Sequence, residues 1–209
     1  MVLELYLDLL SQPCRAVYIF AKKNNIPFMM KPVEMLKGSG GAGGRRSPVA
    51  PLFSCPPIFS RLPPPSPETG ARSSRSPLPV SVGQVVIPLF IGHQVSPEKL
   101  HEAMEELNHT IQKLEDKFLQ EKPFLIGPEI SLADLVAIVE LMQPFGASCD
   151  ILEGHPKLQE WRKRVELTLG KELFMEAHNR ILNPQELKSI VIDPPLKAQM
   201  KPLLLKMLK

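Results

Sequence analysis

Residues 2–36 read VLELYLDLLSQPCRAVYIFAKKNNIPFMMKPVEML, and this stretch decides the N-terminal fold. An apolar run with partial alternation over 2–10 predicts a buried strand, and the run over 28–36 predicts a second strand. Residues 13–24 carry apolar side chains at helical spacing, which predicts a helix between the two strands. The order strand, helix, strand is typical of a β-α-β unit, so we expect the strands to be parallel.

Prolines and asparagines mark where these elements begin and end. Pro13 suits the first turn of the helix, because a residue at that position needs no N–H donor. Asn24 and Asn25 favour the end of the helix, and Pro27 prevents it from continuing. Pro32 cannot donate to a strand ladder, so the second strand should lie at an edge or contain a bulge.

The chain from residue 85 onward is predicted to be helical. Ser96 and Pro97 are a suitable cap and first residue for a long amphipathic helix. Its apolar side chains recur at spacings of three and four, at Leu100, Ala103, Met104, Leu107, Ile111, Leu114 and Phe118. Further helices are predicted over 132–143, from Pro156 through Leu169, over 171–182 and over 195–208. The fold class is therefore α+β and mostly α.

The tetrapeptide Ser131-Leu132-Ala133-Asp134 has the pattern of a helix-capping box. The Ser131 hydroxyl can accept from a first-turn N–H, and the Asp134 carboxylate can accept from the Ser131 N–H in return. The helix that follows is apolar on almost every side, which predicts a central place in the helical region. We interpret Ser131 and Asp134 as structural N-cap residues.

Composition argues against several classes of protein. The chain has 209 residues, 44% hydrophobic and 22% charged, which is typical of a globular protein, and no apolar run reaches the ~18–20 residues of a membrane-spanning helix. Three scattered cysteines cannot build a disulfide framework, and the N-terminus lacks a secretory pattern, so we expect a cytoplasmic protein. A net charge of +3 gives no argument for nucleic acid, and the five histidines show no metal-ligand spacing.

Ten of the chain's 23 prolines lie in one segment, 38–84. Its 47 residues include 10 Pro, 7 Gly, 9 Ser and 5 Arg, and Glu68 is its only acidic residue. The segment therefore carries a charge of +4, and the remaining 162 residues carry −1. Its apolar residues show neither a strand period nor a helix period, so we expect it to be disordered.

Three stretches together resemble the cytosolic glutathione S-transferases, and specifically their theta class. They are the opening from Val2 to Phe28, the run PFLIGPEISLADLVAIVEL at 123–141 and the run GHPKLQEWRKRVE at 154–166. The resemblance covers 1–37 and about 85–209, and 38–84 does not match. It implies a truncated thioredoxin-like unit over 1–37, the disordered segment, and an all-helical C-terminal domain over 85–209. We interpret the edges of 38–84 as splice boundaries; an ordinary in-frame exon for this segment in related transcripts would contradict that.

The resemblance implies that Ser11 is the catalytic residue. A hydroxyl that donates to a sulfur atom at a helix N-terminus favours the thiolate, which is the nucleophile. Position alone allows a second interpretation, a plain N-cap serine. Nearby, Cys14 is expected to be a small packed residue, and Arg15 is expected to be solvated.

The resemblance implies that glutathione is the cosubstrate and that a small electrophile is the second substrate. It also implies a homodimer and no bound prosthetic group. The other glutathione-binding residues of the family belong to the region that 38–84 replaces, and none can be assigned here. We therefore expect impaired activity. A non-catalytic variant or an interaction protein is the alternative. The resemblance also implies that the basic amphipathic tail 195–209 covers the hydrophobic substrate site. We favour this over contact with an acidic membrane surface, because Pro202 interrupts a helix that would lie along the membrane.

Overall fold

The structure is a computed structural model that describes residues 2–34, 97–146, 149–183, Pro194 and Ala198. The segment 38–84 and, apart from Ala198, the predicted helix over 195–208 lie outside the described residues. The elements follow the order β1 (Leu3–Leu7), α1 (Gln12–Lys23), β2 (Phe28–Pro32), α3 (Pro97–Lys113), η2 (Leu114–Leu119), α4 (Leu132–Gly146), α5 (Pro156–Leu169) and α6 (Lys171–Leu182). The described chain is thus α+β and mostly α, as the sequence predicts.

The N-terminal elements form the predicted β-α-β unit. β1 and β2 are parallel, in a register that pairs Leu3 with Phe28 and Leu7 with Pro32. Both strands are shorter than predicted. β1 ends at Leu7 because the Asp8 carboxylate accepts a hydrogen bond from the Leu10 N–H and turns the chain.

Helix α3 continues without a break into the π-helical segment η2, and here one core prediction is wrong. Phe118 lies on the predicted apolar stripe but is 44% exposed, whereas Glu115 and Leu119 are buried. The Gln120 N–H bonds to the carbonyl of Glu115, five residues back, so the turn is wider than an α-helical turn. The wider turn shifts which side chains face the core.

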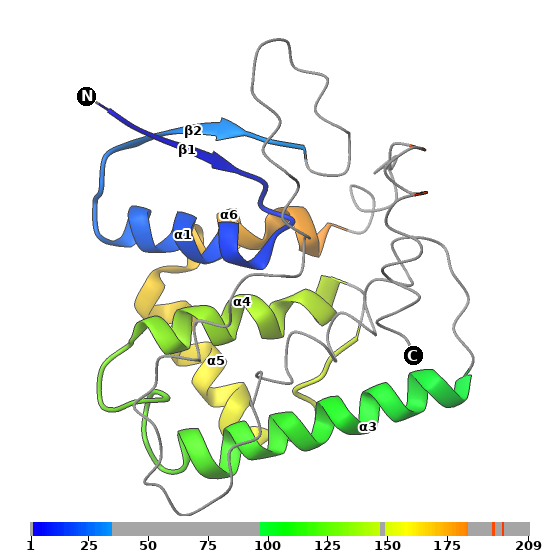
Figure 1. Ribbon diagram of the computed structural model, residues 1–209. Helices are drawn as coiled ribbons and strands as arrows, with labels where there is room; N and C mark the ends of the chain where they lie inside the picture. The colour runs from blue at the N-terminus through cyan, green and yellow to red at the C-terminus, as the bar shows by residue number, and fades with distance from the viewer. Residues whose placement is uncertain (1, 35–96, 147–148, 184–193, 195–197, 199–209) are drawn as a thin grey trace, which may run out of the picture.

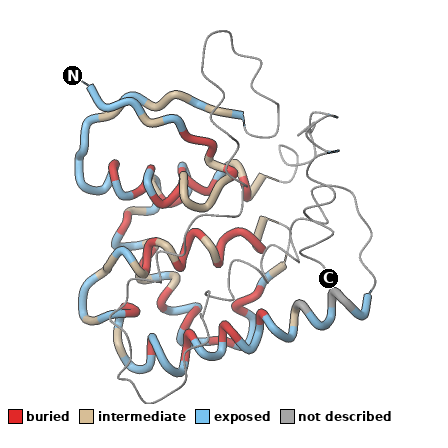
Figure 2. Tube along the Cα trace, viewed as in Figure 1, coloured by how far each residue is buried: buried red, intermediate tan, exposed pale blue. Residues whose placement is uncertain are grey.

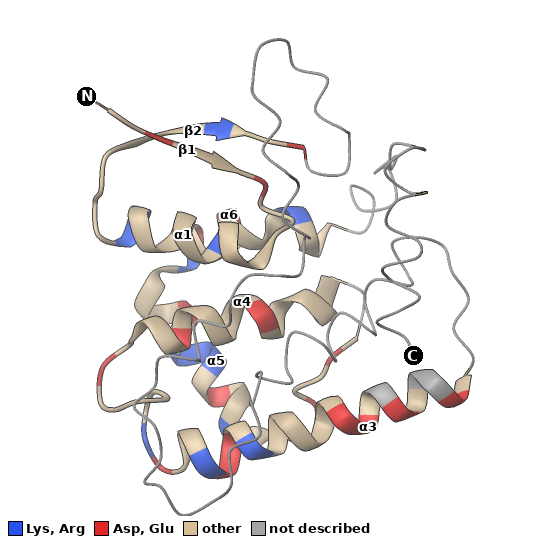
Figure 3. Ribbon diagram, in the orientation of Figure 1, with Lys and Arg blue, Asp and Glu red and all other residues tan. Residues whose placement is uncertain are grey.

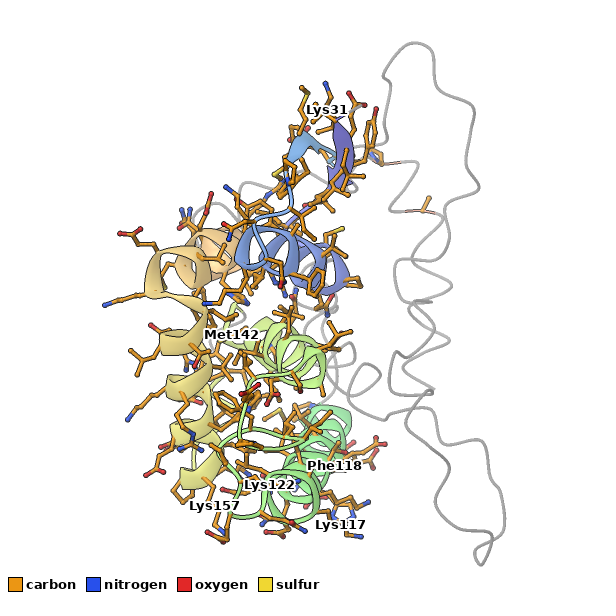
Figure 4. The ribbon with its side chains drawn as sticks, turned by 90° about the vertical axis from the view of Figure 1, so that its left-hand side faces the viewer. Lys31, Lys117, Phe118, Lys122, Met142 and Lys157 are labelled. Atoms are coloured by element: carbon orange, nitrogen blue, oxygen red, sulfur yellow. The ribbon has the colours of Figure 1, made fainter. Side chains whose placement is uncertain are left out.

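The helices stack in layers below the two strands. Figure 1 shows the two strands at one end, then α1 beside α6, then α4, then α5 and α3. Figure 2 shows that burial is concentrated on the inward sides of these helices, and Trp161 of α5 is fully buried. Figure 4 places Met142 of α4 among the packed helices, with Lys31 of β2 at one end of the molecule and Lys157 at the other.

Helix α4 is the central element of this stack. Its side chains are apolar on nearly all sides, and it packs against α1, α5 and α6. Within the described residues, every helix is too short or too polar to cross a lipid bilayer.

Candidate active site at the start of helix α1

Ser11 lies directly before the first residue of α1, at the end of the turn that follows β1. Its backbone is extended, with φ −84° and ψ 129°, and its carbonyl accepts the first helical hydrogen bond, from the Arg15 N–H at 3.0 Å. The half-buried hydroxyl makes no capping hydrogen bond to the helix. The plain N-cap interpretation therefore lacks the side-chain bond that defines a cap.

The charges along α1 leave its N-terminus open to an anion. The first turn carries no acidic residue, and Lys22 and Lys23 lie in the last turn, at the opposite end of the helix (Figure 3). Both cations sit where the helix dipole favours positive charge. The partial positive charge of the first turn is not neutralised by a carboxylate of the helix itself.

The turn before Ser11 is built around the buried carboxylate of Asp8, which is 2% exposed. Asp8 Oδ1 accepts from the Leu10 N–H at 3.0 Å and from Nη1 of Arg180 in α6 at 2.7 Å. The Asp8 carbonyl accepts from the Ser11 N–H at 2.9 Å. A residue of the helical domain therefore holds the acid that shapes this turn.

Arg15 was expected to be solvated, and this prediction is wrong, because its side chain is 0% exposed. Nη1 donates to the carbonyls of Leu9 and Leu10 at 2.8 and 3.0 Å. Nη2 donates to the carbonyl of Val139 at 2.9 Å and to Oε1 of Gln143, both in α4. Burial lowers the pKa of Arg15 to about 10, so the guanidinium stays charged at neutral pH. Four acceptors compensate for the lost hydration of this cation.

Two further titratable groups lie near Arg15 in the same interface. Burial raises the pKa of Glu140 to about 7, against the opposing attraction of Arg15. Burial, followed by the charge of Arg15, lowers the pKa of His178 to about 3, so this imidazole is neutral. Its Nδ1 lies 2.8 Å from the Phe174 carbonyl and must donate to it, so Nε2 is left as an acceptor.

Ser131 and Asp134, the predicted capping residues, lie at the start of α4, away from the turn at Ser11. The Ser131 hydroxyl was predicted to accept from a first-turn N–H, but in the structure it donates to the Asp134 carboxylate. Asp134 Oδ2 accepts from the Ser131 N–H at 2.9 Å and from the Ser131 hydroxyl at 2.6 Å. Oδ1 accepts from the Leu125 N–H and from Nε1 of Trp161, each at 2.8 Å. This one buried carboxylate ties the loop before α4 and helix α5 to the start of α4.

The remaining candidates from the sequence take packing positions. Cys14 is half-buried and contacts the edge of the core. Arg162 is only partly exposed, because its guanidinium lies 4.5 Å from the centre of the Phe145 ring. Among residues 2–34, 97–146 and 149–183, no three His, Cys, Asp or Glu side chains converge as metal ligands would.

The sequence prediction missed the residues that hold the turn before Ser11. They are Asp8, Arg15 as a buried cation, Gln143 and Arg180. The only local signal is Asp8, a carboxylate inside an otherwise apolar run. Gln143 and Arg180 are polar residues at the ends of helices, and nothing nearby in the sequence distinguishes them from solvated side chains.

Comparisons with known proteins agree with this architecture. The sequence profile of the family described as "Glutathione S-transferase, C-terminal domain" matches residues 81–167. Glutathione S-transferase theta-1 of Gallus gallus and that of Homo sapiens are each 43% identical to this chain, with both chains covered completely. The alignment with the human protein spans 243 positions against 209 residues here, a difference of 34.

A solved structure shows the same fold. The human theta-class glutathione transferase, in complex with the glutathione conjugate of 1-menaphthyl sulfate, superposes with a TM-score of 0.73 at 34% identity, and both chains are covered completely. The β-α-β unit, the helical stack and the extent of these matches lead to one assignment: the chain belongs to the glutathione S-transferase family, and within it to the theta class.

Proposed function

We propose that this chain transfers the glutathione thiolate to small electrophiles and that Ser11 is its catalytic residue. The observation that carries the proposal is the Ser11 hydroxyl, which lies at the N-terminus of α1 without a capping bond. A thiol with a pKa near ~8.5 is only a few per cent ionised at neutral pH. A hydroxyl that donates to the sulfur, together with the positive end of the helix, favours the anion.

The proposed reaction is a direct substitution between the two substrates, and Ser11 stabilises the attacking thiolate. The thiol proton passes to solvent, the sulfur forms a bond to the electrophilic carbon, and the leaving group departs with the electron pair of its former bond. Glutathione as cosubstrate is supported by the human theta-class structure, which holds a glutathione conjugate. The three scattered cysteines fit a reducing compartment and support a cytoplasmic place for this chemistry.

Glutathione binding is expected to be weaker than in complete theta-class relatives. The resemblance assigns the γ-glutamyl-binding Glu-Ser pair to the region that 38–84 replaces, and in this segment Glu68 is followed by Thr69. Each charge-assisted hydrogen bond that is lost costs ~1.5–3 kcal/mol, so several such losses weaken binding by orders of magnitude. The same region carries the family's dimer contact, so the homodimer remains a prediction that size-exclusion chromatography tests.

Two variants test the role of Ser11. Ser11→Ala removes the hydroxyl, and Thr168→Ala removes an exposed hydroxyl from α5 that donates to the Arg164 carbonyl of its own helix. In an alkyl-halide assay at high glutathione concentration, Ser11→Ala should lower kcat/KM by roughly 10–100-fold. Its pH profile should also move to higher pH, and Thr168→Ala should leave both unchanged. Equal turnover by Ser11→Ala and the unmodified chain would refute the assignment.

The impairment is tested separately, by the KM for glutathione. We expect a value at least ~10-fold above that of human theta-1 under the same conditions, because binding bonds are lost. A KM equal to that of the human protein would show that another part of this chain supplies the missing contacts.

A further inference from the structure

The two peptide units that lead into Ser11 are each held at both ends. In the first unit, the Leu9 carbonyl accepts from Nη1 of Arg15 at 2.8 Å, and the Leu10 N–H donates to Asp8 Oδ1 at 3.0 Å. In the second unit, the Leu10 carbonyl accepts from the same Nη1 at 3.0 Å, and the Ser11 N–H donates to the Asp8 carbonyl at 2.9 Å. Because a peptide unit is planar, bonds at both of its ends fix its orientation.

The two residues that hold these peptide units are themselves held by the helical domain. Nη2 of Arg15 donates to Val139 and Gln143 of α4, and Asp8 Oδ1 accepts from Arg180 of α6 at 2.7 Å. Asp8 and Arg15 are both buried, where charge-assisted bonds are little weakened by water. Figure 1 shows the start of α1 close to the end of α6, with α4 beneath.

We propose that Asp8 and Arg15 form a clamp that positions the Ser11 hydroxyl, so that helices α4 and α6 control the activation of glutathione. Neither residue needs to touch the substrate, so both are positioning residues and not catalytic ones. The proposal rests on the proposed function of Ser11. It adds that the catalytic geometry of the N-terminal unit is imposed by the C-terminal helical domain.

The reason that position matters here is the directionality of the hydrogen bond to sulfur. A donor loses strength steeply as its angle to the acceptor falls below about 120°, so a small rotation of the Ser11 peptide weakens the bond to the thiolate. A misplacement of about 1 Å in a reacting geometry can cost ~100-fold in rate. Loss of the clamp should therefore affect the chemical step more than the overall fold.

Three variants distinguish an effect on the position of Ser11 from an effect on the stability of the fold. They are Arg15→Lys, Gln143→Leu and Lys23→Met. Lysine keeps the charge at position 15 but cannot bond both loop carbonyls and both α4 acceptors at once. Gln143→Leu removes one α4 acceptor and leaves the bonds from Arg15 to the Leu9 and Leu10 carbonyls in place. If Arg15→Lys does not fold, Gln143→Leu tests the clamp in its place. Lys23→Met is the matched control, because Lys23 is an α1 cation that donates to the Thr168 carbonyl of α5, far from Ser11.

Three measurements are made on the full chain: kcat/KM against pH, the melting temperature, and amide hydrogen exchange over residues 9–12. Arg15→Lys should lower kcat/KM at least ~10-fold, shift the pH profile to higher pH and speed exchange in this peptide. Gln143→Leu should have the same three effects to a smaller degree, and Lys23→Met should have none of them. A folded Arg15→Lys variant with an unchanged pH profile and unchanged exchange would overturn the clamp.

Ser11→Ala in the same assays distinguishes the two proposals. If Ser11→Ala lowers kcat/KM and Arg15→Lys does not, the clamp fails and the role of Ser11 stands. If Ser11→Ala has no effect, the proposed role of Ser11 fails, and hydrogen exchange alone decides whether Asp8 and Arg15 hold the turn. Faster exchange in Arg15→Lys, but not in Lys23→Met, would then show that Arg15 holds the turn, and equal exchange in both would refute that as well.

Discussion

Glu140 is a buried carboxyl near Arg15 whose ionisation lowers the stability of the folded chain. Its Oε2 is buried and has no hydrogen-bond partner among the described residues, and burial raises the pKa of the carboxyl from 4.5 to about 7. The folded chain therefore keeps this proton at a pH at which the unfolded chain has released it. Stability from this group falls as the pH rises from about 4.5 to about 7.

Glu140→Gln should abolish this loss, because glutamine resembles the protonated acid. At pH 5 the variant and the unmodified chain should be about equally stable, and at pH 8 the variant should be more stable by ~1–3 kcal/mol. Urea denaturation at the two pH values measures the difference. Glu102→Gln, at an exposed carboxylate of α3, is the control. A variant that is no more stable than the unmodified chain at pH 8 would contradict the burial argument.

His178 acts in the opposite direction, which is why the comparison is made between variants and not from one pH curve. Its pKa is lowered from 6.5 to about 3, so between these pH values the imidazole is protonated in the unfolded chain and neutral in the folded chain. Stability from His178 is therefore lost as the pH falls from about 6.5 towards 3. Between about 4.5 and 6.5 the two effects partly cancel.

At the scale of the elements, Asp134 links the start of α4 to its neighbours. The buried carboxylate accepts four hydrogen bonds, from Ser131, Leu125 and Trp161. Asp134→Ala would leave buried donors unsatisfied, so we expect a loss of ~3–5 kcal/mol in the free energy of unfolding. Trp161 fluorescence during urea unfolding measures this loss. A change below ~1 kcal/mol would show that water replaces the carboxylate at little cost.

The contact between α4 and α6 is as close at Gly146 as the backbone allows. A Cβ added at this glycine would lie 2.5 Å from the carbonyl oxygen of Ile181, which is backbone and cannot rotate away. Gly146→Ala should therefore separate the two helices and cost ~1–3 kcal/mol. The matched control is Gly127→Ala, where a Cβ would meet nothing within 4 Å. Thermal melts of both variants measure the difference, and equal melting temperatures would contradict the close approach.

Helices and strands were largely predictable from the sequence, because their signals are local. The parallel pair of β1 and β2 follows from the β-α-β order, and α5 and α6 begin where proline and helical spacing predict. The misplacement of Phe118 has a different origin. A helix that widens from α to π at Leu114 leaves no mark in an apolar spacing of three and four, so the sequence pattern assigns the wrong side chain to the core.

At the scale of the whole molecule, the chain combines a theta-class framework with an unusual composition in one segment. Human theta-1 aligns over its full length, yet the alignment has 34 more positions than this chain has residues. Ten of the 23 prolines lie in 38–84, in the region to which the resemblance assigns the rest of the glutathione site. We therefore expect the unusual segment to weaken the binding of glutathione.

Glutathione should therefore stabilise this chain less than it stabilises a complete relative. A ligand at 100 times its Kd adds about 2.7 kcal/mol to folding stability, and at a concentration equal to its Kd it adds only ~0.4 kcal/mol. For a chain of this size, we expect a rise in melting temperature of ~1 °C here and of ~5–10 °C for human theta-1 at the same glutathione concentration. Equal rises in the two proteins would contradict the impairment.

The sequence by itself determined the kinds of element, their order, the membership in the family and Ser11 as the residue to test. These features depend on local spacing, caps and motif residues, which are read within a few turns of chain. Only the tertiary structure decided that Arg15 is buried and that it joins Leu9 and Leu10 to Val139 and Gln143. The acceptors in α4 lie more than 120 residues further along the chain, and no local pattern encodes a hydrogen bond between groups that only packing brings together.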